Sequence, residues 1–194
     1  MQRPELEEII ACLPRGRTLY RYFPDRQALW LLARALDGAG EGARIADLRQ
    51  GARARHLGRP AVKAVIAAKG DGLLTAADLD AAWPRRWRTY RLTLGRWGSD
   101  KRRDAAYLQT SRPGWNLVLQ MNFSGEHDAP YRRYIGDHMH HPFEFFGHPV
   151  ARRRGHTLAW ARLDLDLATG EALIEEVQND WLRFAGWRRQ EYLA

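Results

Sequence analysis

The sequence predicts an α+β fold in which a helical N-terminal half precedes an antiparallel sheet. Apolar residues recur at helical spacing through most of residues 1–84, whereas side chains alternate with a period of two from residue 85 onward. A glycine-containing turn then joins the last two predicted strands. We therefore expect a helical subdomain over 1–84 and a sheet subdomain over 85–194, either as separate units or as one continuous domain.

The helical half is predicted from apolar stripes and from residues that begin or end helices. Asp25 is placed to cap the second helix, and Thr75 with Asp78 forms the pattern of a capped helix that stops at Pro84. A strand-like piece at 18–23 interrupts the helices. The predicted helices cover residues 4–13, 26–37, 43–57, 60–68 and 76–83.

The sheet half is predicted from alternation. In the strand over 115–123, apolar residues at odd positions alternate with Asn116, Val118, Gln120 and Asn122, so we expect a half-buried strand with an amide-rich outer face. Gly170 lies in the turn of the last hairpin, where a positive φ is required. The other predicted strands cover 88–94, 156–166 and 172–179, and a helix follows over 181–193.

Composition narrows the class of protein. The length of 194 residues suffices for a self-contained core, and Cys12 is the only cysteine, which excludes an internal disulfide. No apolar run approaches twenty residues, so we expect no membrane span and a cytoplasmic location. Nothing in the sequence specifies an oligomeric state.

The formal net charge of +8 makes a polyanion such as nucleic acid a candidate partner. Arginine clusters near tryptophan or tyrosine suit single-stranded nucleic acid, because aromatic rings stack on bases while guanidinium groups contact phosphates. Alternatively, the arginine bias reflects base composition of the genome and the rings serve packing. The clusters include Arg85–Arg86, Lys101–Arg103, Arg132–Arg133, Arg152–Arg154 and Arg188–Arg189.

Histidines gather between residues 127 and 156. His138, His140 and His141 adjoin Asp137, and His148 follows close behind. Imidazoles and carboxylates at this spacing are candidate ligands for zinc or another divalent metal. The alternative is a polar loop, because the spacing lacks the i, i+4 geometry of a helical zinc motif.

Both strands of the last predicted hairpin carry carboxylates. Asp164 and Asp166 precede Glu175, Glu176 and Gln178, an order that resembles the metal-dependent nucleases of the restriction-endonuclease-like family. That resemblance implies carboxylates that hold magnesium, with glutamine where the family usually has lysine. The pairing register decides between this hypothesis and a cross-strand ion pair of Arg162 with Glu176.

A longer stretch, from Thr157 to Trp181, resembles a segment of uncharacterised bacterial and phage proteins that reads Glu-Glu-Val-Gln-Asn-Asp-Trp. The segment is also remotely similar to the centre of the Gcn5-related acetyltransferases, in which a loop binds the pyrophosphate of acetyl-CoA. The resemblance places that loop at Arg183 and Gly186, with Arg188 in place of a small residue.

These observations rank three functions. The first is a diverged protein similar to acyl-CoA acyltransferases, without established catalysis and with acetyl-CoA as the implied cofactor. The second is a nucleic-acid-binding module that uses the arginine and tryptophan surface. The third is a divalent-metal nuclease built on the C-terminal hairpin.

Overall fold

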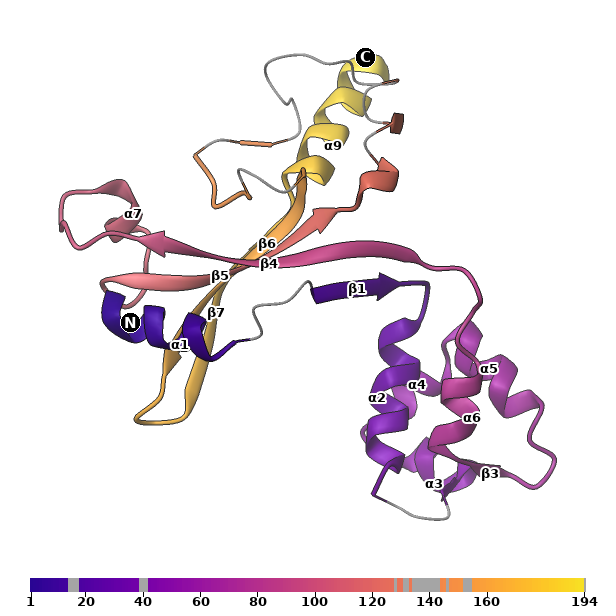
Figure 1. The fold of residues 1–194 in the computed structure, drawn as a ribbon. Helices are drawn as coiled ribbons and strands as arrows, with labels where there is room; N and C mark the ends of the chain where they lie inside the picture. The colour runs from indigo at the N-terminus through magenta and orange to yellow at the C-terminus, as the bar shows by residue number, and fades with distance from the viewer. Residues whose placement is uncertain are drawn as a thin grey trace. The chain divides into compact units, whose positions relative to one another are not determined.

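The computed structural model describes residues 1–13, 18–38, 42–127, 129–130, 133, 144–145, 147–151 and 155–193, with only the backbone at position 188. It confirms the α+β class: helices accompany a five-stranded sheet (Figure 1). Two compact units are present, one formed by Met1–Tyr20 with Thr89–Ala194 and the other by Arg21–Arg88. The division differs from the expected 1–84 and 85–194 in that the first residues belong with the sheet.

The unit Arg21–Arg88 is built around a leucine-rich core. Leu29 and Leu32, one helical turn apart on one face, are fully buried with Leu74 and Leu79. Position 42 requires glycine, because the backbone adopts φ 94° and a Cβ would lie 2.6 Å from the Leu74 carbonyl oxygen. Its elements are α2 (Arg26–Leu36), β2 (Ala43–Arg44), α3 (Ile45–Gln50), α4 (Ala54–Leu57), α5 (Pro60–Ala67), β3 (Leu73–Leu74) and α6 (Ala76–Ala81).

Asp25 does not cap its own helix as predicted. It occupies the N-cap position of α2 with φ 62°, a left-handed conformation, and its side chain makes no capping hydrogen bond there. Instead, Oδ2 accepts a hydrogen bond of 3.1 Å from the backbone N–H of Ala61, in the first turn of α5. The carboxylate thus satisfies a free amide of a different helix and joins the starts of α2 and α5.

The predicted capping box at the start of α6 is confirmed. Asp78 N–H donates to Thr75 Oγ1 at 3.2 Å, and Thr75 N–H donates to Asp78 Oδ2 at 2.9 Å. Asp78 also accepts from the Thr75 hydroxyl at 2.7 Å and pairs with Lys69 Nζ at 2.9 Å. The Thr75 and Lys69 side chains together lower the pKa of Asp78 to about 2.

This depressed pKa predicts an acid-sensitive contribution to the stability of the helical unit. An ordinary aspartate has a pKa of about 3.9, so the stabilisation is present above about pH 4 and is lost as the pH falls through about 2. We expect Asp78→Asn to flatten this part of the pH dependence, measured by thermal unfolding, while Asp80→Asn on the same helix serves as the control. Equal acid sensitivity of parent and Asp78→Asn would contradict the assignment.

The other unit contains the sheet, with strand order β1-β4-β5-β6-β7 (Figure 1). Neighbours from β4 to β7 pair antiparallel, and the predicted C-terminal hairpin is confirmed: Asp166 lies opposite Glu171, and Gly170 adopts φ 72°. The elements are α1 (Arg3–Cys12), β1 (Thr18–Tyr22), β4 (Arg88–Gly98), α7 (Ala105–Leu108), β5 (Trp115–Phe123), a 3₁₀ turn (Gly125–His127), β6 (Thr157–Asp166), β7 (Glu171–Gln178) and α9 (Asp180–Leu193).

Helix α1 packs against one face of β5. Leu6 from the helix and Leu117 from the strand are buried together, with Leu163 and Leu165 of β6 packed against them. The apolar stripe predicted for the first helix therefore has its partner in the sheet. This packing explains why the first residues belong with the sheet unit and not with the other helices.

On the opposite face of β5, the side chains predicted to be exposed are buried. Asn116, Gln120 and Asn122 are buried, whereas Leu119 is 37% exposed. Asn122 Nδ2 donates to Thr93 Oγ1 at 2.8 Å and its Oδ1 accepts from Thr157 Oγ1 at 2.7 Å. The prediction that these amides face solvent is therefore wrong. Neighbouring strands supply hydrogen-bond partners, which offset the cost of burying the amides.

Candidate functional site

A β-bulge in the last hairpin sets the geometry of the candidate site. Arg162 pairs with Glu176 and Leu163 pairs with Ile174, so Glu175 is the extra residue on β7. Consecutive side chains of a regular strand point to opposite faces, whereas here both glutamates line the same cavity as Arg162. The register left open by the sequence is thus the one that pairs Arg162 with Glu176.

The guanidinium group of Arg162 contacts two glutamates and a backbone carbonyl. Its Nε and Nη2 donate to Glu176 Oε2 at 3.1 and 2.9 Å, and Nη1 donates to the Gln109 carbonyl at 2.9 Å. Glu175 Oε2 lies 3.9 Å from Nη1, and the exposed fractions of the Arg162 and Glu175 side chains are 8% and 2%. Glu175 Oε1 also accepts from Ser111 N–H at 2.8 Å. The result is a cluster of charges in which Arg162 and Glu175 are almost fully buried and Glu176 is 36% exposed.

Beside this cluster lies a cavity of about 460 Å³. Two of its indoles, Trp97 and Trp160, have buried N–H groups with no hydrogen-bond partner among the described residues. The protein covers both N–H groups, so the two indoles contribute ring surface to the cavity and not hydrogen-bond donors. The lining residues are Trp97, Gln109, Phe145, Gly147, His148, Pro149, Trp160, Arg162, Glu175 and Glu176.

His148 connects the cavity to α9. Its Nδ1 lies 2.8 Å from Asp180 Oδ2, and Gln178 Nε2 donates to Asp180 Oδ1 at 2.5 Å. The imidazole contacts the rings of Phe145 and Trp160, with centroids 4.9 and 5.5 Å away. Gln178, predicted as part of a nuclease centre, thus serves to hold Asp180.

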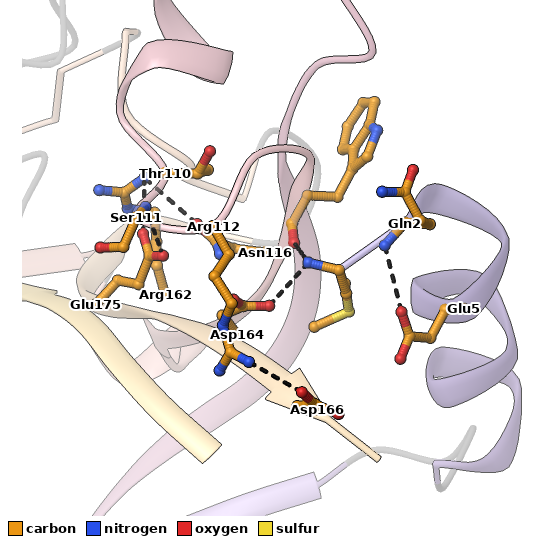
Figure 2. A network of polar contacts seen from close by, with 12 residues as sticks. Gln2, Glu5, Thr110, Ser111, Arg112, Asn116, Arg162, Asp164, Asp166 and Glu175 are labelled. Atoms are coloured by element: carbon orange, nitrogen blue, oxygen red, sulfur yellow. Dashed lines mark hydrogen bonds and ion pairs between the residues drawn. The ribbon is translucent and has the colours of Figure 1, made fainter. Parts of the chain in front are cut away.

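Asp164, the remaining predicted catalytic residue, is engaged elsewhere on β6 (Figure 2). The Met1 α-ammonium contacts its Oδ1 at 2.8 Å, and Arg112 Nε approaches its Oδ2 at 2.6 Å. Arg112 also pairs with Asp166 at 3.3 Å, and backbone N–H groups of Thr169 and Ala168 help to lower the pKa of Asp166.

The hairpin carboxylates therefore lie within ion-pair distance of cations of the chain itself. Asp164 is paired with Arg112, and the two glutamates are grouped with Arg162. Within the described part of the chain, no group of three or more histidine, cysteine, aspartate or glutamate residues could hold a metal ion. The candidate ligands His138, His140 and His141 lie outside the described residues.

Arg183 and Gly186 lie inside α9, not in a loop that precedes a helix. The Arg183 N–H is bonded to the Asn179 carbonyl, and Asn179 Oδ1 accepts from Leu182 N–H at 2.9 Å, which makes Asn179 the cap of this helix. Backbone amides in a helix interior are occupied by intrahelical hydrogen bonds, so these residues lack the exposed N–H groups of a pyrophosphate loop.

Within each unit, arginine side chains lie over tryptophan rings. Arg21 lies over Trp87 at 4.7 Å in the helical unit, and Arg162 lies 6.0 Å from the Trp97 ring in the sheet unit. These rings are at least partly used in packing. None of the helices in the described ranges is long and apolar enough to cross a membrane.

Sequence reasoning missed the cavity as a site. His148 stood out only as one histidine of the cluster between residues 127 and 156. The signal available was the Gln178–Asp180 pair after a strand, but its partner lies 30 residues away in sequence. No protein-family model matches the chain, and no curated protein or solved structure matches it significantly.

Proposed function

We propose that the cavity lined by residues of β4, β6 and β7 binds a small organic molecule that is neutral or cationic. Its volume of about 460 Å³ lies within the range of ligand pockets, and aromatic rings of Trp97, Phe145 and Trp160 line it. The observation that carries the proposal is that these aromatic rings and the carboxylates of Glu175 and Glu176 line one cavity.

The charge of the lining favours this ligand class over an anion. Glu175 and Glu176 outnumber Arg162, whose guanidinium is already engaged by Glu176 and Gln109. A phosphate or carboxylate would therefore meet excess negative charge, although the chain as a whole carries +8. Aromatic faces combined with carboxylates are typical of sites for organic cations.

The charge preference is tested with three molecules that share one ring: benzylammonium, benzyl alcohol and benzoate. We expect benzylammonium to bind best and benzoate least, measured by calorimetry and by the thermal midpoint. Glu176→Gln should weaken benzylammonium binding roughly 3- to 30-fold and leave benzyl alcohol nearly unaffected. Glu7→Gln, at an exposed ion pair on α1, is the matched control.

Two outcomes would contradict the proposal. If none of the three molecules binds at millimolar concentration, the cavity does not take ligands of this size and kind. If benzoate binds best, the charge argument fails. Acetyl-CoA and a single-stranded oligonucleotide, which carry phosphates, extend the comparison to the ligands implied by the sequence.

A further inference from the structure

The hydrogen bonds around Asp180 assign the proton on the imidazole of His148. An ionised carboxylate only accepts hydrogen bonds, and Asp180 is 6% exposed. Its Oδ1 takes the Gln178 amide, and its Oδ2 lies 2.8 Å from His148 Nδ1. Nδ1 also lies 3.0 Å from Gln178 Nε2, whose amide already donates to Asp180. Because Oδ2 cannot donate, its shorter contact with Nδ1 is a hydrogen bond only when Nδ1 carries the proton, and the lone pair of the neutral ring is then on Nε2.

We infer that His148 is a general base for a substrate bound in this cavity and that Asp180 is its positioning residue. The inference rests on the proposed function, because a base needs a bound molecule from which to take a proton. Nε2 makes no hydrogen bond with the described residues, and the ring itself lines the cavity. The substrate class is an organic molecule with an acidic O–H, N–H or C–H group.

The surroundings suit this role. When Nε2 takes a proton, the ring becomes a cation, and the adjacent Asp180 carboxylate stabilises that charge. The charged groups that line the cavity with His148 are Glu175 and Glu176 on β7 and Arg162 on β6. Contacts with Phe145 and Trp160 fix the plane of the ring.

A probe for base catalysis that needs no natural substrate is 5-nitrobenzisoxazole, a small neutral aromatic molecule. His148 Nε2 would take the proton on C3, the electrons of that C–H bond would form the nitrile, and the N–O bond would break. The product, 2-cyano-4-nitrophenolate, is followed by its absorbance. General-base catalysis is worth about 10²–10⁴-fold, so we expect His148→Ala to lower the turnover at least about 100-fold.

The control for this variant is His56→Ala, which removes an imidazole from the helical unit and should leave turnover unchanged. Asp180→Asn tests the positioning role. Its amide can donate to Nδ1, so ¹⁵N NMR should show the His148 proton moved to Nε2, with kcat lowered and KM nearly unchanged. Circular dichroism verifies that each variant is folded.

Binding of the probe, measured by quenching of tryptophan fluorescence, separates the two proposals. If the probe binds and turnover does not depend on His148, the base role is overturned and the binding site stands. A wild-type ring protonated on Nε2 would overturn the base role as well. If the probe and the benzyl compounds all fail to bind, the binding site is overturned together with the base.

Discussion

Replacement of Arg162 by alanine is expected to lower the free energy of unfolding of the sheet unit by about 3–5 kcal/mol. The change removes the cation closest to Glu175, whose side chain is 2% exposed, and it takes the donor from the Gln109 carbonyl. A buried carboxylate without a compensating charge is costly, and the loss of side-chain packing adds to the effect.

Denaturation by guanidinium chloride measures the change, and hydrogen exchange of the β6 and β7 amides assigns it to the sheet. The matched control is Arg96→Ala, because Arg96 pairs with Glu7 where both side chains are half exposed, and its loss should cost under about 1 kcal/mol. Adding Glu175→Gln to the Arg162→Ala chain should recover part of the loss. An effect of Arg162→Ala no larger than that of Arg96→Ala would mean that the cluster is well hydrated.

Features set by neighbouring residues were predictable from the sequence. The capping box of Thr75 and Asp78 depends on two side chains within one helical turn, and the hairpin turn depends on Gly170 with its positive φ. The alternation in 115–123 likewise predicted a strand with correct bounds. Each of these features is decided by local backbone geometry, and therefore by residues that are close together in the sequence.

Features that depend on distant partners were not predictable. The bulge at Glu175 changes which residues face Arg162, and no local pattern in Glu171–Gln178 announces it. The cavity joins residues from β4, β6 and β7 with His148, so its wall exists only after the strands have paired. The sequence left two hypotheses for Glu176, a metal site and an ion pair with Arg162, because the strand register that decides between them depends on the bulge.

The two faces of β5 offer the sharpest comparison between pattern and structure. Alternation predicts that Leu119 is buried and Asn122 exposed, whereas the structure places Asn122 at 0% and Leu119 at 37% exposure. We therefore expect Asn122→Leu to cost about 2–5 kcal/mol, because the donor to Thr93 and the acceptor for Thr157 disappear while both partners stay in place.

Leu119→Asn, three residues earlier on the same strand, should cost only about 1 kcal/mol, because its side chain already contacts water. The two exchanges run in opposite directions, so strand propensity favours the Asn122→Leu variant over the Leu119→Asn variant. The predicted order therefore appears only if the burial and hydrogen bonds of Asn122 outweigh strand propensity. Urea denaturation of the two variants measures it. If Leu119→Asn proves more damaging than Asn122→Leu, the hydrogen bonds of Asn122 contribute less to stability than the partly exposed Leu119 side chain does, and the buried amides cannot be what holds these strands in register.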